Sequence, residues 1–170
     1  NIDNTIYVWD PTSGSFLTHN GTLGTLGNGR IAPYQAFWIR TNGANPQLQL
    51  TGNDVKTIVS KEFFGRKTEE EPFAIQLAVT GEDMQAESFI SFGREGKESN
   101  DPKDAYQLES LADDWLFLYT YGSLRTSNPL VINSLPMLDE REMIIPVHLA
   151  ASKNGKAFQG SFLMNWTLPN

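Results

Sequence analysis

The segment Trp115-Leu116-Phe117-Leu118-Tyr119-Thr120-Tyr121 decides how the rest of the chain is interpreted. In a β-strand, successive side chains point to opposite faces. One face of this strand would carry the rings of Trp115, Phe117, Tyr119 and Tyr121. The other face would carry Leu116, Leu118 and Thr120. Both faces are largely apolar, so we expect either a central strand covered on both sides or a strand whose aromatic row lines a groove.

Further segments of alternating hydrophobicity lie on both sides of this strand. The predicted strands cover residues 5–9 and 16–18 as one hairpin, 34–40, 47–51, 55–60, 73–80, 87–92, 130–133, 142–149 and 158–167, with a strand or helical turn in 104–111. Asn154-Gly155 predicts a tight turn between the last two strands, and the alternation places Trp166 in the core. About ten short strands without helical periodicity indicate an all-β fold, an antiparallel β-sandwich of jelly-roll or Greek-key type.

Composition limits the class of protein. The 170 residues suit a single module over residues 1–170, with a possible sub-boundary at the polar segment 61–72. The chain starts inside a predicted strand, so we expect a fragment of a larger protein. A net charge of −7 with scattered Lys and Arg predicts no nucleic-acid partner, and the lack of a run of ~18 apolar residues predicts no membrane insertion. The absence of Cys rules out disulfides but not export, and the abundance of Asn, Thr, Ser, Gln and Gly with few Lys is typical of a secreted or cell-surface bacterial β-protein.

Several motifs resemble one known family. The segment Ile31-Ala32-Pro33-Tyr34-Gln35-Ala36-Phe37-Trp38-Ile39 resembles a signature of large proteins exported by the type IX system of Bacteroidetes. Shorter similarities cover Thr5–Asp10 with Gly14 and Phe16, Asp104–Leu108, Leu118–Thr120 with Ile132–Pro136, Ile145–Leu149, and Gly160 with Phe162 and Trp166. Gln107 departs from the pattern, where Lys is common. Trp9 and Trp38 replace smaller aromatic residues.

This resemblance implies a non-catalytic β-sandwich module that precedes the C-terminal sorting domain of a surface adhesin or a polysaccharide-degrading enzyme. No catalytic residue follows from it.

Exposed aromatic rings are the candidate ligand-binding groups, because the apolar face of a sugar ring stacks on a flat aromatic side chain. Trp9 and Trp38 have polar neighbours on their own strand faces, and Tyr34 and Tyr121 flank loops. The aromatic row of 115–121 could form a sugar platform, but the burial statistics of aromatic residues favour the core for it. The candidate ligand-binding residues are Trp9, Tyr34, Trp38, Trp115, Tyr119 and Tyr121.

Acidic residues offer weak candidates for a structural calcium site. Asp101, Asp104, Asp113 and Asp114 are close in sequence, and Ca²⁺ takes six to eight oxygen ligands from such loops. The favoured alternative is that they are solvated loop charges.

No catalytic motif is present in the sequence. Two His and no Cys leave little for a zinc site, and no nucleophile elbow occurs. Glu87 is the carboxylate to test if glycoside hydrolysis were found.

The leading hypothesis is therefore a non-catalytic carbohydrate-binding accessory module with a polysaccharide ligand and no cofactor other than possible structural calcium. The alternative is a structural spacer or an adhesion module that binds another surface protein.

Overall fold

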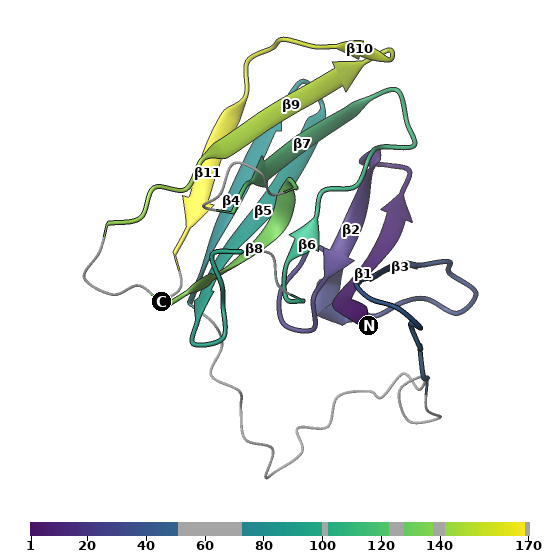
Figure 1. The fold of residues 1–170 in the computed structure, drawn as a ribbon. Helices are drawn as coiled ribbons and strands as arrows, with labels where there is room; N and C mark the ends of the chain where they lie inside the picture. The colour runs from purple at the N-terminus through teal and green to yellow at the C-terminus, as the bar shows by residue number, and fades with distance from the viewer. Residues whose placement is uncertain (51–72, 100–101, 123–127, 138–141, 169–170) are drawn as a thin grey trace.

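The computed structural model describes residues 1–50, 73–99, 102–122, 128–137 and 142–168. Within these ranges the chain forms eleven strands and one short 3-10 helix, Gly27–Gly29, in two sheets (Figure 1). The strands are β1 Ile2–Asp10, β2 Ser15–His19, β3 Trp38–Thr41, β4 Phe73–Gly81, β5 Met84–Gly93, β6 Ala105–Tyr106, β7 Trp115–Thr120, β8 Leu130–Pro136, β9 Val147–Lys153, β10 Lys156–Ala157 and β11 Leu163–Thr167. The all-β class is confirmed. No helix among the described residues is long and apolar enough to cross a membrane.

The smaller sheet has the order β2-β1-β3 and contains the predicted N-terminal hairpin. Trp9 pairs with Phe16 across that hairpin, and Gly14 takes a φ of 63° in its turn. The third strand starts later than the predicted segment 34–40, at Trp38. Before it, the N–H of Gln35 donates to the carbonyl of Ala32 over 3.1 Å, so these residues form a turn rather than a strand.

The larger sheet has the order β10-β9-β7-β8-β5-β4-β11, and β6 adds to β8. Its strands are mostly antiparallel, but β5 and β8 run parallel with Phe89 opposite Ile132, which corrects the purely antiparallel expectation. The chain between these two strands includes β6 and β7, so a hairpin does not join them. The sheet curls so that β7 and β9 lie over β4 and β5, which makes a β-sandwich-like arrangement without a clear jelly-roll order (Figure 1).

The main core fills the inside of this curl. Its buried members are Leu77, Val79, Ile90, Phe92, Leu116, Leu118, Leu135 and Ala151. Leu77 and Val79 lie on the face that the alternation of 73–80 predicted as buried. Leu116 and Leu118 cover them from β7, with exposed fractions of 1% and 0%.

Other predictions fail towards the C-terminus. The predicted strand 142–149 begins only at Val147, directly after Pro146, which has no N–H for a strand ladder. The predicted strand 158–167 begins at Leu163 and pairs with β4, not with β9. Trp166, expected in the core, is 67% exposed, because β11 is the terminal strand of its sheet and no described element covers it.

The predictions between β3 and β4 were either wrong or lie outside the described residues. Residues 47–50 form no strand. The predicted strand 55–60 and the possible boundary at 61–72 lie outside the described residues.

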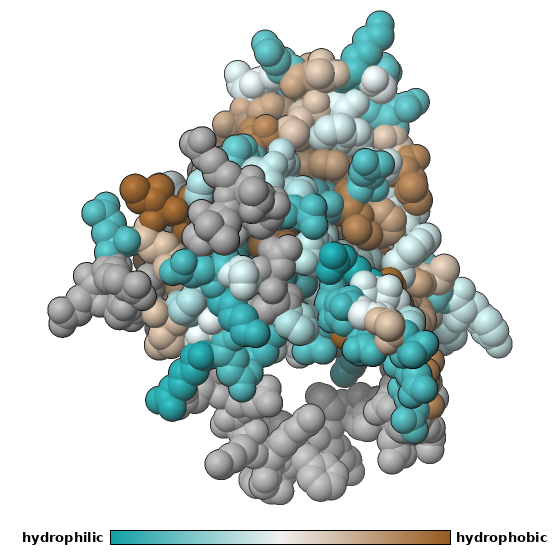
Figure 2. All heavy atoms as spheres, in the orientation of Figure 1, coloured by the Kyte–Doolittle hydropathy of each residue, from teal (hydrophilic) through white to brown (hydrophobic). Residues whose placement is uncertain are grey.

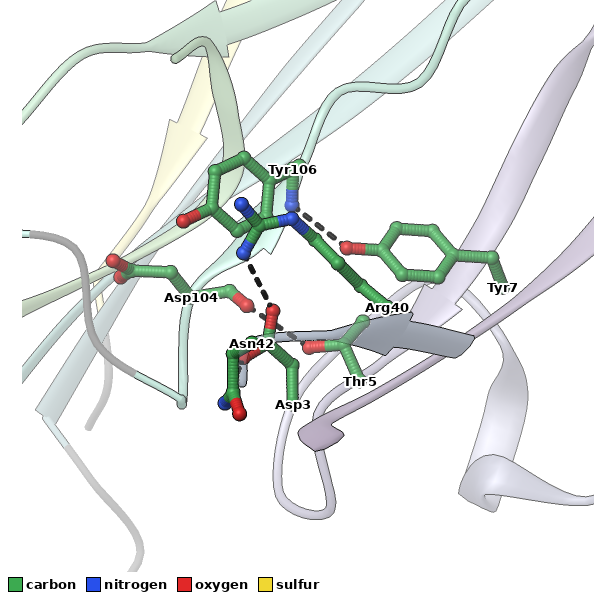
Figure 3. Close-up of polar contacts among 7 residues, drawn as sticks. All are labelled: Asp3, Thr5, Tyr7, Arg40, Asn42, Asp104 and Tyr106. Carbon is green, nitrogen blue, oxygen red and sulfur yellow. Dashed lines mark hydrogen bonds and ion pairs between the residues drawn. The ribbon is translucent and has the colours of Figure 1, made fainter. Parts of the chain in front are cut away.

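A cation–π contact helps to join the two sheets, and an ion pair within the smaller sheet holds its cation. The Arg40 guanidinium is 2.9 Å from the Asp3 carboxylate and lies 3.8 Å from the centroid of the Tyr106 ring (Figure 3). The Asn42 side-chain amide donates to the other Asp3 oxygen over 2.6 Å. Asp3 is buried, so these partners satisfy a carboxylate that would otherwise be costly to remove from water.

Two hydrogen bonds from β1 complete this junction. The Tyr106 N–H donates to the Tyr7 hydroxyl over 2.9 Å, and the Thr5 hydroxyl donates to the carbonyl of Asp104 over 3.0 Å (Figure 3). Burial raises the pKa of Tyr7 to about 12. The smaller sheet is therefore attached to the larger one through buried polar contacts at β6.

Candidate functional site

A cleft of about 170 Å³ lies between the two sheets, bordered by β2, β5 and β7. We call it the inter-sheet cleft. Two aromatic rings line it, Phe16 from the smaller sheet and Phe117 from the larger one. Its hydrogen-bonding side chains belong to Asp10, Ser13, Ser15, Thr25, Gln85, Glu87 and Gln107. Apolar ring faces and polar groups thus share one small cavity.

An aromatic cluster of the smaller sheet reaches this cleft through Phe16. The Phe16 ring lies between Trp9 and Trp38, with centroid distances of 5.1 and 5.2 Å and edge-to-face geometry. Trp38 is 43% exposed and Trp9 is half-buried. Strand alternation pointed to both Trp residues but not to Phe16, although the predicted hairpin places Phe16 opposite Trp9.

The aromatic row of β7 forms a second cluster. Trp115 and Phe117 are stacked at 4.2 Å with an interplanar angle of 21°. Tyr119 is stacked on His148 of β9 at 5.6 Å, and Tyr121 meets the same imidazole edge-to-face at 4.8 Å. Each ring of the row is half-buried, whereas the leucines on the opposite face of β7 are fully buried.

This burial bears on the two arrangements left open for β7. The leucine face is core, and the rings of the aromatic row on the other face are half-buried, so the row is neither fully buried nor a freely exposed platform. Because Trp115 and Phe117 stack on one another, each ring has only one face left for a ligand. Burial, followed by the neighbouring Tyr121, raises the pKa of Tyr119.

A larger hollow of about 720 Å³ lies beside the β9–β10 turn, and we call it the hairpin groove. Trp115, Phe158 and Phe162 supply its rings. Its small residues are Ala112, Ala150, Ala151, Gly155, Ala157 and Gly160, and its polar side chains are Asp113, Ser152 and Gln159. On the face drawn in Figure 2, apolar side chains gather in the upper half, where Figure 1 places β7, β9 and β10.

The carboxylate of Asp10 is held in its charged form. Burial alone would raise its pKa, but hydrogen bonds from the Thr12 N–H at 3.0 Å and the Ser13 hydroxyl at 2.8 Å outweigh burial and lower it. Glu87 accepts a hydrogen bond from the Gln76 amide at 3.3 Å. The Asp10 carboxylate therefore lies at the cleft as a hydrogen-bond acceptor of its own turn.

The proposed calcium ligands do not converge. Asp104 is buried, and its carboxylate accepts the N–H of Ser134 at 2.9 Å. Asp114 accepts the N–H of Asn154, and the carbonyl of Asp113 accepts the Ser152 hydroxyl, so both brace the β9–β10 hairpin. Asp101 lies outside the described residues. Among those that are described, no group of three or more His, Asp or Glu could hold a metal ion.

The remaining candidate, Tyr34, lines neither hollow. It is fully exposed in the turn that precedes β3, with a φ of 66°, a conformation that is uncommon for residues other than glycine. Of the predicted residues, only Trp115 lines a hollow, the hairpin groove. Trp9 and Trp38 contact Phe16 of the cleft without lining it, and Tyr119 and Tyr121 continue the β7 row.

Comparison with known proteins adds no family to this picture: no protein-family model, curated protein or solved structure matches the chain.

Proposed function

We propose that this chain is a non-catalytic carbohydrate-binding module that holds a polysaccharide at the inter-sheet cleft. The observation that carries the proposal is the convergence of two aromatic clusters on one polar cavity, through Phe16 and Phe117. Aromatic rings supply apolar faces for the C–H side of a sugar, and nearby polar groups orient its hydroxyls. The resemblance to type IX-secreted proteins supports the same role in a secreted or cell-surface protein.

The polar lining suits sugar hydroxyls, each of which both donates and accepts a hydrogen bond. Gln85 and Gln107 offer amide donors and acceptors, and Ser15 offers a hydroxyl. Glu87 and Asp10 offer carboxylate acceptors, which form the stronger charge-assisted hydrogen bonds.

A binding role fits these carboxylates better than hydrolysis does. Glycoside hydrolases use one carboxyl group with a raised pKa as the general acid, paired with a second carboxylate. The pKa of Asp10 is instead lowered by its own hairpin turn. Asp10 therefore suits ligand binding better than general-acid catalysis.

Titration calorimetry of the isolated chain against a panel of plant and algal polysaccharides tests this function. Phe16→Ala is expected to weaken binding by about 2 kcal/mol, roughly thirtyfold, as loss of a buried aromatic anchor does. Phe73→Ala is the matched control, because Phe73 is 44% exposed and lines neither hollow. Equal binding by both variants and the parent chain would contradict the assignment of this cleft.

Protein adhesion is the second candidate function, and β11 favours it. All five residues of this strand are exposed and uncharged, and one edge of β11 has no partner among the described strands. An apolar edge strand of this kind is a template for strand addition by another chain.

A second copy of the chain is the partner that can be tested directly for such adhesion. Asn165→Lys would place a charge in the middle of β11. Sedimentation equilibrium should show self-association of the parent chain that this variant loses. A parent chain that stays monomeric at all concentrations would remove the support for self-adhesion through β11.

A further inference from the structure

We infer that the module recognises an extended, uncharged stretch of polysaccharide that occupies both the inter-sheet cleft and the hairpin groove. This inference rests on the proposed function and adds to it the length and the charge of the ligand. It follows from the way the two hollows are joined, from their sizes and from the charges of their linings.

The two hollows share a wall. Phe117 lines the inter-sheet cleft and Trp115 lines the hairpin groove, and their rings are stacked at 4.2 Å. They are neighbours on one face of β7, so their backbone positions are ~6.5–7 Å apart. A ligand that contacts both rings therefore passes directly from one hollow into the other.

Small residues form the divide between the hollows. The turn of the first hairpin meets the segment before β7 here, and the Ser110 hydroxyl donates to the carbonyl of Gly14 over 2.6 Å. A methyl group on Gly14 would lie 3.4 Å from the Ala112 side chain and 2.2 Å from the carbonyl oxygen of Asp114. Ser13, beside Gly14, lines the cleft, while Ala112 lines the groove. The divide is thus narrow: the turn of the first hairpin packs directly against residues 112–114, with only small residues at the contact.

The sizes of the hollows favour a chain over a single sugar. The cleft, at about 170 Å³, is smaller than the roughly 300 Å³ at which sites for drug-sized ligands begin, whereas the groove, at about 720 Å³, lies within that range. The small polar cleft would bind one unit closely. The larger groove, with three aromatic rings, would take the units that follow.

The charges of the linings exclude polyanions. The described lining residues of both hollows include Asp10, Glu87 and Asp113 but no Lys or Arg. Lys153 lies near the groove, 5.3 Å from the centroid of the Phe158 ring, but it is also 3.8 Å from the Glu82 carboxylate. With a net charge of −7 on the whole chain, a uronate or sulfated glycan would be repelled. The ligand class is therefore a neutral polysaccharide.

A length series tests this inference. Titration calorimetry would use neutral β-1,4-linked gluco- and xylo-oligosaccharides of two to six units, with oligogalacturonates of the same lengths as the charged comparison. Affinity of the parent chain for the neutral series should rise by about tenfold or more from the disaccharide to the hexasaccharide. Trp115→Ala should reduce hexasaccharide affinity to the disaccharide level. Phe16→Ala should weaken every length, and Phe73→Ala should change none.

A measurement on the parent chain removes the dependence on a variant that could misfold. In NMR spectra, the Trp115 indole N–H, assigned with Trp115→Phe, should shift with hexasaccharide and stay unchanged with disaccharide. Equal affinity for all neutral lengths, or no shift of this signal, would overturn the extended-ligand inference and leave sugar binding at the cleft intact. Tighter binding of oligogalacturonates would overturn the neutral class. Absence of binding by these oligosaccharides and by the whole polysaccharide panel would instead refute the proposed function.

Discussion

Replacing Tyr7 by Phe removes one oxygen atom from the junction between the two sheets. Tyr7 is 1% exposed, and its hydroxyl accepts the Tyr106 N–H over 2.9 Å, with Tyr106 itself 7% exposed. Loss of one partner from a buried hydrogen bond costs about 1–3 kcal/mol. For a chain of this length, that cost corresponds to a fall in Tm of about 2–4 °C for each kcal/mol. We therefore expect Tyr7→Phe to be less stable than the parent chain at neutral pH.

The same hydroxyl predicts a difference at alkaline pH. Burial raises the pKa of Tyr7 to about 12, against 10.0 for an ordinary tyrosine. Between these values the unfolded chain releases the proton first, so the free energy of unfolding falls as the pH rises through this window. The difference between these two pKa values corresponds to about 2–3 kcal/mol of free energy of unfolding. This contribution is fully present below pH 10 and is lost as the pH passes 12. The variant lacks this contribution, so the difference in stability between parent and variant should itself depend on pH.

Urea unfolding followed by tryptophan fluorescence, at pH 7 and at steps up to pH 11, measures both effects. Tyr34→Phe is the matched control, because it removes the same atom from a fully exposed side chain and should change stability by less than about 0.5 kcal/mol. If Tyr7→Phe were as stable as this control at pH 7, the hydrogen bond would not hold the sheets together. If parent and variant lost stability in parallel above pH 10, the burial of the phenol would be refuted.

Three further predictions concern packing and metal content. Gly14→Ala should lower the free energy of unfolding in urea by about 1–3 kcal/mol, because the new methyl group would lie 2.2 Å from the Asp114 carbonyl oxygen at a φ of 63°. Gly27→Ala is the control and should change stability little, because open space surrounds Gly27. Similar losses for both variants would contradict the close approach at Gly14. Leu118→Ala should lower the free energy of unfolding by about 2–5 kcal/mol, because Leu118 is 0% exposed. Leu163→Ala should change it by no more than about 0.5 kcal/mol, because Leu163 is 64% exposed. A reversed order would mean that the buried face of β7 is misassigned. EDTA should leave Tm unchanged, because the carboxylates of Asp104 and Asp114 already accept the N–H groups of Ser134 and Asn154; a fall in Tm that calcium restores would argue for a metal site.

Strand alternation and turn residues predicted the parts of the fold that depend on residues close together in the sequence. The alternation of 73–80 and the hairpin closed by Gly14 form as predicted. The Asn154-Gly155 turn also forms, but it leads into the short β10 and not into the predicted strand 158–167. These features follow from the two-residue period of a strand and from the backbone freedom of particular turn residues, which a short segment contains in full.

Long-range pairing was beyond such patterns. The parallel pairing of β5 with β8 joins segments that are separated by two other strands, and no local signal encodes it. Trp166 pairs with Leu77 of β4, and both side chains lie on the same side of the sheet. Leu77 is buried, but the place of Trp166 on the terminal strand leaves it exposed. A hydrophobic pattern says which face a residue occupies and not whether another layer covers that face.

The same limit applies to the site. Alternation identified Trp9, Trp38 and Trp115, but the rings that line the cleft are Phe16 and Phe117, brought together from different sheets. Only the packing of one sheet against the other shows that they share a cavity.

The junction at β6 also bears on how the chain folds. The bonds from Thr5 to Asp104 and from Tyr106 to Tyr7 each join residues 99 positions apart in the sequence. Closing so long a loop costs entropy that is recovered only when the distant contacts form, so such pairings slow folding. During synthesis the hairpin of β1 and β2 emerges before the later strands of this module, yet these two bonds can form only after the chain has been made past Tyr106. The first strands of this module to be synthesised are therefore among its last to reach their final place.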